Sequence, residues 1–492
     1  MFSPDKWFTN PSTGFYPHTI DQSLRLNSAD SAYIYWNPTT TSNQKTWTIS
    51  LWVKRSVLST NQSIFTVGTS ANGFEIRFNT DDTIIIQSRV GSSNRFVQDT
   101  DEKFRDVGAW YHIVYMLDTT QATNTDRANL WVNGSDVALT QFTSNTLWPT
   151  QDQNQRVNYA GDDFQFGISR VLSAYTNAYL AEINFVDGAN LQATDFGETK
   201  DGVWIPKEYS GSYGTNGFHL TFADSSAIGD DLSGNGNDFT ANNLVASDVV
   251  LDSPTNNFAT FNNIVGYKAT TDPAFSEGNL KTAPESDGIG YEYTGVSSTI
   301  NVSSGKWYAE FKPTATTGVT NYYLIGIIEE GLDRMTSNSS NNTWDGGFVY
   351  TGAGQIRGSG NVITSSWGDT YTTDDVIGVA IDMDDGKVWF SKNGTFQASG
   401  DPAAGTNAAF TTLKTYKNTY AFSVGCGQTS SQYYQYEGNF GQNPSFNGTF
   451  TGGDVGTQTD GNGIGLFKYA PPSGFLALCT SNLPDPTIGP GQ

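Results

Sequence analysis

The chain has little cysteine, little histidine and little positive charge. Its 492 residues include 2 cysteines and 3 histidines, and 26 lysines and arginines stand against 49 aspartates and glutamates, for a net charge of −23. Two cysteines, Cys426 and Cys479, are too few for a disulfide framework, so we expect buried free thiols. A strongly acidic surface repels phosphate backbones, which argues against a nucleic-acid partner.

Long apolar runs are also missing. No stretch approaches the roughly 20 apolar residues of a membrane span, so we expect no membrane insertion. The first residues, Met1 to Phe8, carry neither a basic segment nor an apolar segment of the kind found in secretory signals. If the protein acts outside a cell, the expected route is lysis or assembly.

Histidine is too scarce and too scattered for a catalytic or metal centre. His18, His112 and His219 lie far apart and share no metal-ligand spacing, and no Gly-x-Ser-x-Gly motif supplies a nucleophile. His112 falls within an alternating strand pattern, where a packed structural residue is expected. We therefore expect no catalytic residues and no enzyme.

Carboxylates are plentiful, so a glycosidase pair has to be considered. Glu182 and Asp187 are five residues apart and would face opposite sides of a strand. Asp382 and Asp384 would share a face, but they flank a turn. Turn and surface acids are the expected interpretation. A glycan-degrading enzyme would require a carboxylate pair in a groove, which the sequence does not reveal.

The patterns that are present predict an all-β protein. Aromatic residues make up 13% of the chain, and it contains 52 glycines. Residues 47–55 alternate, with Trp47 and Ile49 on one face, and residues 374–394 form two strands joined by the turn Asp384-Asp385-Gly386. No 3.6-residue period persists, so little helix is expected.

Three segments in order resemble a laminin-G-like (concanavalin-A-like) domain: a Trp-x-His strand at 110–118, a strand ending in Val-Asn-Gly at 128–134, and a closing strand with an acidic residue at 179–188. Further along, Trp307-Tyr308-x-Glu310, residues 376–382, 389–394 and 439–442 resemble the SPRY domain, also in family order. The resemblances imply two concanavalin-A-like antiparallel β-sandwiches (jelly rolls) in tandem. The SPRY resemblance implies partner recognition through loops.

The whole arrangement resembles virion surface proteins of tailed phages, especially marine ones. The resemblance is carried by the start Gly14 to Arg25, the join at 253–260 and the segment Pro471 to Leu478. The expected organisation is an N-terminal docking arm (1–19), a laminin-G-like sandwich (20–190), a connector packing on it (191–262), a SPRY-like sandwich (263–446) and an extended C-terminal segment (447–492).

This resemblance implies a non-enzymatic structural protein of a phage particle. A tail fibre, an adhesin or a capsid decoration would each fit, on the head or the tail. Expected partners are other virion proteins, further copies of the chain (a trimer if it forms a fibre) and host-surface glycan. The alternative is a secreted or cell-surface carbohydrate-binding, lectin-like module.

Loop aromatics of the SPRY-like region are the candidate binding residues, because sugars stack on Trp and Tyr while carboxylates and amides read their hydroxyls. They are Trp344, Asp345, Trp367, Asp369 and Tyr434. For Trp344 and Trp367 a core position at the end of the sandwich is the open alternative.

No cofactor is expected, although calcium stays open at one oxygen-rich loop. Asp231, Asn235, Asn237 and Asp238 supply carboxylate and amide oxygens, and laminin-G-like domains sometimes bind calcium at the sandwich rim. The competing hypothesis, a hydrogen-bonded Asx turn without metal, is the one we favour.

Overall fold

The computed structural model divides into two compact units, Met1–Asn256 and Asn257–Gln492. The residues that it describes are 15–266, 273–286, 295–316, 320–329, 347–358, 361–413, 419–426 and 432–483. Their named elements are strands and 3₁₀ turns of three or four residues, which confirms the all-β class. Within these residues no helix is long and apolar enough to cross a membrane.

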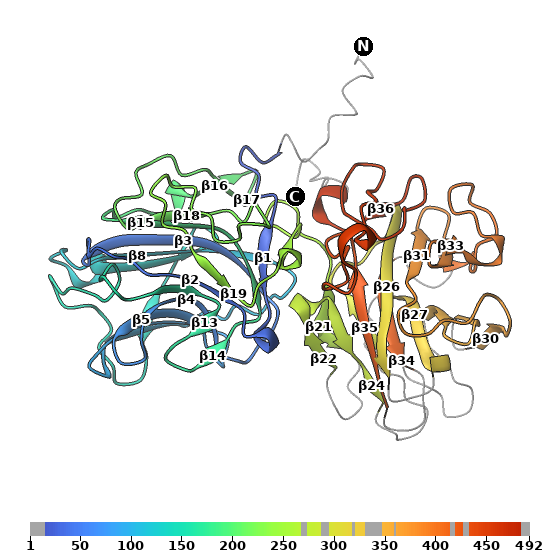
Figure 1. Ribbon diagram of the computed structural model, residues 1–492, viewed down its shortest axis with the longest axis horizontal. Coiled ribbons are helices and arrows are strands. Elements are labelled where there is room, and N and C mark those ends of the chain that lie inside the picture. The colour runs from blue at the N-terminus through green and yellow to red at the C-terminus, as the bar shows by residue number, and fades with distance from the viewer. Residues whose placement is uncertain are drawn as a thin grey trace, which may run out of the picture. The chain divides into compact units, whose positions relative to one another are not determined.

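The first unit consists of two antiparallel sheets, each of eight strands within the described residues. One sheet contains β1 (Ser23–Leu26), β3 (Thr46–Arg55), β8 (Trp110–Asp118), β9 (Ala128–Val132), β10 (Ser135–Val137), β15 (Ala178–Asp187), β18 (Phe218–Leu220) and β20 (Val249–Val250). The other contains β2 (Tyr33–Trp36), β4 (Gln62–Gly68), β5 (Gly73–Phe78), β6 (Ile84–Val90), β7 (Ser93–Thr100), β11 (Leu139–Gln141), β12 (Phe164–Phe166) and β19 (Thr240–Asn242). Figure 1 shows β3 and β8 in one layer and β4 and β5 in the next, which is a β-sandwich.

Alternation along the central strand β3 builds the core of this sandwich. Trp47, Ile49, Leu51 and Val53 are fully buried between the sheets, as the sequence pattern predicts. Burying each such side chain contributes about 1.5–3 kcal/mol relative to leaving it exposed. Trp52 points to the opposite face, where it joins a separate apolar cluster.

The segment expected to be a connector completes the first unit. Strand β18 pairs with β15, β19 with β2, and β20 with β1. A small hairpin, β16 (Gly197–Lys200) and β17 (Val203–Pro206), carries Trp204 onto the apolar clusters of the outer face. The division between the units therefore falls after Asn256 rather than at residue 262.

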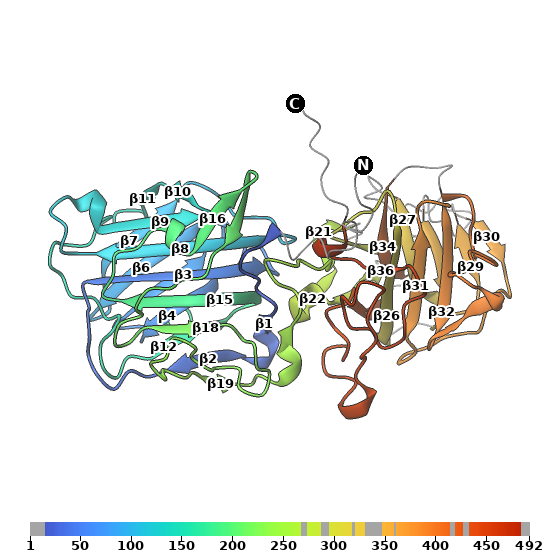
Figure 2. The same ribbon diagram turned by 90° about the horizontal axis from the view of Figure 1, so that it is seen from above.

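The second unit is also formed by two sheets, of seven and nine strands within the described residues. The seven-stranded sheet contains β21 (Phe261–Gly266), β25 (Gly295–Ser298), β27 (Tyr323–Glu329), β28 (Gly347–Thr351), β29 (Ile356–Gly358), β30 (Asn361–Thr364) and β34 (Tyr420–Cys426). The nine-stranded sheet contains β22 (Ala274–Ser276), β23 (Lys281–Ala283), β24 (Glu285–Ser286), β26 (Lys306–Thr316), β31 (Ile377–Asp382), β32 (Lys387–Lys392), β33 (Thr395–Phe396), β35 (Gln432–Asn439) and β36 (Leu476–Ala477). Figure 2 shows β26, β31 and β32 side by side.

The hairpin predicted between residues 374 and 394 is formed by β31 and β32. All six residues of β31 pair with β32, from Ile377 opposite Lys392 to Asp382 opposite Lys387. Gly378 is needed in the middle of β31, because a Cβ there would lie 2.4 Å from the Ser391 hydroxyl. Cys426 and Cys479 are buried thiols that form no disulfide, as expected.

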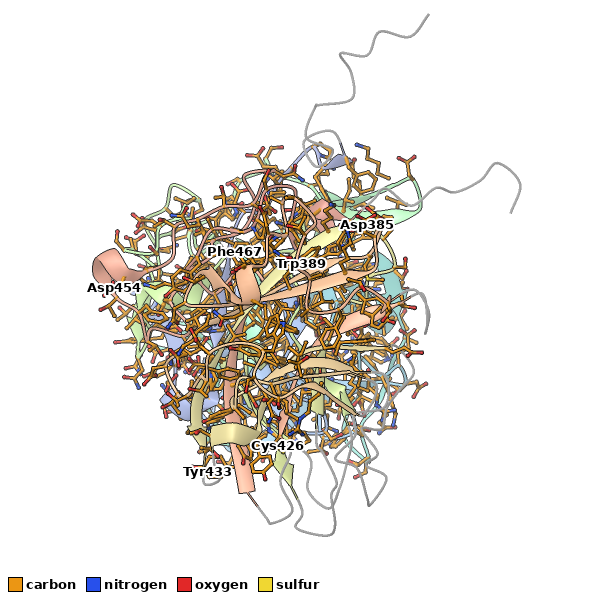
Figure 3. The ribbon with its side chains drawn as sticks, turned by 90° about the vertical axis from the view of Figure 1, so that its right-hand side faces the viewer. Asp385, Trp389, Cys426, Tyr433, Asp454 and Phe467 are labelled. Atoms are coloured by element: carbon orange, nitrogen blue, oxygen red, sulfur yellow. The ribbon has the colours of Figure 1, made fainter. Side chains whose placement is uncertain are left out.

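Residues 447–483 fold back onto the second unit, which corrects the expectation of an extended segment. Strand β36 joins β26 in parallel. Phe467 packs edge-on against Tyr308 with ring centroids 5.2 Å apart, and Phe475 packs against Trp389 at 6.0 Å. Figure 3 labels Phe467 and Trp389 on this unit. Aromatic side chains drive this packing, because they bury a large apolar area.

Candidate functional site

Trp367 packs against the core of the second unit. Its ring lies edge-on to Tyr350 at 5.5 Å and to Phe390 at 6.0 Å, and it is only partly exposed. The sequence left two interpretations open for Trp367, a binding residue on a loop or a core residue. The structure favours the core residue.

Tyr434 is a core residue, and its assignment to a binding loop is corrected. Strand β35 begins at Gln432, so Tyr434 lies on a strand, fully buried, with its ring 5.2 Å from Tyr323. Alternation along β35 turns Tyr433 outward instead, and that side chain is 38% exposed. Tyr433 lies with Cys426 at the end of the unit opposite Asp385 (Figure 3).

Asp369 is exposed, but its backbone is fixed. Its N–H donates to Oε1 of Gln397 at 2.9 Å, and its carbonyl accepts the hydroxyl of Tyr350. Trp344 and Asp345 lie outside the described residues. Of the five candidate residues, the structure therefore describes one exposed carboxylate, Asp369, and one partly exposed ring, Trp367.

The candidate calcium loop is closed by its own hydrogen bonds. Asp231 Oδ1 accepts the backbone N–H groups of His219 and Ser233, both at 2.8 Å. Its Oδ2 accepts the Asn237 N–H at 2.9 Å and the Ser233 hydroxyl at 2.8 Å. Both carboxylate oxygens therefore already hold protein donors, as in an Asx turn.

The remaining loop residues serve the same turn. Asp238 Oδ1 accepts the Asp231 N–H at 3.0 Å, and the side-chain amides of Asn235 and Asn237 donate to the Gly217 carbonyl. Within the described part of the chain, no group of three or more His, Cys, Asp and Glu side chains is arranged to hold a metal ion. The geometry favours the turn.

Glu182 is held by two histidines rather than paired with Asp187. Its Oε1 lies 3.2 Å from Nε2 of His18 and 2.8 Å from Nε2 of His219. Burial disfavours its charge, but the hydrogen bonds from both histidines outweigh burial and lower its pKa to about 2. Asp187 instead accepts the N–H of Asn216 at 3.0 Å. The two acids are engaged separately and do not form a glycosidase pair.

His112 is a structural residue of the first unit. Its ring stacks on Trp52 at 4.7 Å and on Trp204 at 5.9 Å. The Trp204 indole donates to Nδ1 at 3.0 Å, so Nε2 carries the proton and donates to the Ser50 hydroxyl at 2.8 Å. Burial lowers its pKa to about 3, which keeps it neutral at ordinary pH.

Asp382 and Asp384 support the β31–β32 turn. Asp382 is fully buried, lies 2.9 Å from Nζ of Lys306 and accepts the N–H of Asp384 at 3.0 Å. Asp384 in turn accepts the N–H of Gly305 at 2.9 Å. These contacts fix the backbone of the turn and engage the two carboxylates with separate partners.

Glu310 anchors residues 468–469 to the sheet. Its Oε1 accepts the N–H of Tyr469 at 2.7 Å and the Tyr308 hydroxyl at 3.3 Å. Its Oε2 accepts the N–H of Lys468 at 2.8 Å and the side-chain amide of Asn439 at 3.2 Å. Burial outweighs these donors and raises the pKa of Glu310 to about 7. A fully buried carboxyl beneath packed chain is closed to a substrate.

Three tyrosines and an arginine gather on the outer face of the first sandwich. Tyr33 and Tyr35 alternate with the buried Ile34 on β2 and therefore share a face, with ring centroids 5.8 Å apart. Tyr175 lies 6.2 Å from Tyr33. The guanidinium of Arg170 lies over the Tyr33 ring at 5.8 Å. We call these four residues the tyrosine patch.

The tyrosine patch is partly exposed and keeps free polar groups. Each of its four side chains is partly accessible. Within the described part of the chain, the hydroxyls of Tyr33, Tyr35 and Tyr175 make no hydrogen bond. Because the three side chains are partly accessible, these hydroxyls are open to solvent or to a ligand.

Two short strands position the second half of the patch. Strand β13 (Ile168–Ser169) pairs with β14 (Ala174–Tyr175), and the hydroxyl of Thr66 on β4 donates to the Ile168 carbonyl at 2.9 Å. This hairpin therefore lies over β4 and carries Tyr175 and Arg170 to the side of β2. No sequence motif described above predicted the patch. Its detectable signal was the alternation Tyr33-Ile34-Tyr35, which places two rings on one face.

Two family models match the chain. A model described as the concanavalin A-like lectin/glucanases superfamily matches residues 27–194, and the SPRY domain model matches residues 306–443. The chain thus contains a concanavalin A-like domain followed by a SPRY domain, in the order that the sequence motifs predict. The tyrosine patch lies in the first.

Three solved structures illustrate the similarity. The SPRY domain of human HERC1 is 14% identical, with 36% of this chain and 96% of that chain covered and a TM-score of 0.26. A heptameric SAP-like pentraxin from Limulus polyphemus is 15% identical (35% and 78% covered, TM-score 0.27). A putative carbohydrate binding protein from Bacteroides ovatus is 14% identical (46% and 59% covered, TM-score 0.28). A search of curated protein sequences found no match.

Proposed function

We propose that this chain is a non-enzymatic carbohydrate-binding protein that contacts sugar through the tyrosine patch. The observation that carries the proposal is three partly exposed tyrosines with unbonded hydroxyls on one face of a concanavalin A-like sandwich. Aromatic rings supply apolar area at low entropic cost, and hydroxyls supply the hydrogen bonds that fix orientation. In this proposal the binding surface lies on the first unit rather than on the SPRY loops.

The polar chemistry of the described residues supports binding over hydrolysis. Glu182 and Asp187 are engaged by separate partners, and Asp382 holds a turn. Glu310, whose pKa is near neutrality, is fully buried. The family matched by the first unit includes glucanases as well as lectins, so a binding assay should also monitor the release of reducing ends.

We further propose that the protein lies on the surface of a tailed-phage particle, as a tail fibre, adhesin or capsid decoration. The support is the resemblance of three chain segments to such proteins. Two of these segments meet in the first unit, where the Ile20 N–H donates to the Thr255 hydroxyl at 3.0 Å. In the second unit the Ala259 N–H donates to the Leu478 carbonyl at 3.0 Å.

Antibodies against the chain would test this location. They should label the surface of purified particles, on the head or the tail, and light scattering should give the number of copies that associate. A chain that is absent from particles but present on a cell surface would support the lectin-like alternative instead.

The binding proposal is tested with single-ring variants on a glycan array and by calorimetry. Tyr33→Ala and Tyr35→Ala should each weaken sugar binding roughly five- to tenfold, because one aromatic contact is worth about 1 kcal/mol. Tyr159→Ala is the matched control, since that ring is 41% exposed in the same unit but lies against Arg156. Equal binding by all three variants, or no sugar binding by the wild-type chain, would refute the proposal.

A further inference from the structure

Arg170 is held in one orientation by the side chain beside it. Its Nε donates to Oε1 of Gln165 at 2.7 Å, and Gln165 is almost completely buried on β12. The amide of Gln165 in turn donates to Asp163 Oδ2 at 3.3 Å, while Asn37 donates to the other oxygen of Asp163 at 2.6 Å. This chain of contacts fixes the guanidinium before any ligand arrives.

The outer end of the same guanidinium is unoccupied. Within the described residues, Nη1 and Nη2 of Arg170 make no hydrogen bond or ion pair. Asp163, which is linked to Arg170 through Gln165, already accepts hydrogen bonds from Asn37 and Gln165. The two amino groups therefore present a planar pair of donors beside the Tyr33 ring.

A cation with unoccupied donors, such as Arg170, is unusual in a chain with this net charge. Acidic residues outnumber basic residues by 49 to 26, so the overall field repels anionic polymers. A preoriented cation over one ring of the tyrosine patch gives an anionic group a local partner. Carboxylates suit the paired donors because two parallel N–H···O bonds can form.

We infer that the tyrosine patch selects sugars that carry a carboxylate, such as the uronic acids of acidic polysaccharides. The sugar ring would stack on Tyr33 and Tyr35, and its carboxylate would accept from Nη1 and Nη2 of Arg170. This inference rests on the proposed carbohydrate-binding function and adds the chemical class of the sugar.

The test compares a charged ligand with the same oligomer in which methyl esters remove the carboxylate charges. Binding of the full chain to tetragalacturonic acid and to its methyl ester is measured by calorimetry, with a sulfated galactose oligomer as a second anion. We expect the ester to bind at least tenfold more weakly than the acid. Raising the salt concentration from 50 to about 200 mM should weaken binding of the acid and leave the ester unchanged.

Variants assign the charge preference to one residue. Arg170→Gln should reduce the affinity for the acid to the affinity for the ester. Arg170→Lys should recover part of this loss, because lysine keeps the positive charge but lacks the paired N–H donors of the guanidinium. Arg156→Gln, which removes a cation from the Tyr159 ring instead, should behave as wild type. Thermal unfolding of each variant shows whether it is folded.

The outcomes separate the two proposals. Equal affinity for acid and ester, with both weakened roughly five- to tenfold in Tyr33→Ala, would overturn the charge inference and leave the carbohydrate function standing. Tighter binding of the sulfated oligomer than of the acid would overturn the choice of carboxylate. No binding of any sugar by the wild-type chain would refute both.

Discussion

Changing Glu310 to glutamine should remove a pH dependence from the stability of the second unit. The carboxyl is fully buried and holds the backbone N–H groups of Lys468 and Tyr469. Burial raises its pKa from the ordinary 4.5 to about 7. Glutamine keeps the shape of the side chain but cannot titrate. Its NH₂ group would face one of the donors that Glu310 now accepts from, so Glu310→Gln should be less stable than the wild type at pH 5.

The direction follows from which state holds the proton. Below pH 4.5 the folded and unfolded states are both protonated at this carboxyl, and above about 7 neither is. Between these values the folded state alone holds the proton, so the free energy of unfolding falls as pH rises. At about 1.4 kcal/mol per pH unit, the loss across this window is roughly 3 kcal/mol.

Urea unfolding of the full chain at pH 5, 6, 7 and 8 measures this loss. The stability of the wild type minus that of Glu310→Gln should shrink from pH 5 to 7 and then level off. Glu437→Gln is the control, because Glu437 contacts Lys281 and Lys312 and not residues 468–469. A pH-independent difference between wild type and Glu310→Gln would refute the reasoning, because it would mean that Glu310 keeps one charge state throughout.

Three further results are expected. Trp367→Ala should lower the melting temperature of the second unit and reduce its free energy of unfolding by about 2 kcal/mol, because the ring packs on core aromatics. An unchanged melting temperature would show that this packing does not stabilise the unit. A chelator should leave the melting temperature unchanged. Asp231→Ala should lower the melting temperature with or without calcium, because three backbone N–H groups lose their acceptor. Stabilisation of the wild type by calcium would contradict the interpretation of this loop as a metal-free Asx turn. The hydrogen bond with Glu182 raises the pKa of His18, so this contact stabilises the fold fully below pH 6.5 and loses its effect as pH rises through the raised pKa. His18→Ala should therefore destabilise the chain more at pH 6 than at pH 9. Equal destabilisation at the two pH values would show that the protonation of His18 is not linked to folding.

Local patterns were enough to predict the strands. The β31–β32 hairpin and the inward face of β3 depend on alternation and turn residues that are neighbours in sequence. Tyr434 shows the limit of this information. Whether it or Tyr433 faces inward depends on where β35 begins, and the sequence gives strand boundaries only to within a few residues.

The tyrosine patch and the Glu310 anchor depend on contacts between distant segments. Arg170 reaches Tyr33 only because the β13–β14 hairpin lies over β4. Glu310 meets residues 468–469 only because the segment after residue 447 folds back. One sequence holds no information on either approach, since no local period marks it.

The return of β36 to β26 affects how the chain folds during synthesis. Strand β26 ends at Thr316, but its parallel neighbour is complete only once Ala477 has been made. At about 5–20 residues per second, a ribosome leaves the edge of β26 at Trp307 and Tyr308 unpaired for roughly 10–30 seconds. During that interval the backbone of Trp307 and Tyr308 lacks its β36 partner, so nascent chains of the second unit carry an open strand edge that the finished protein never shows.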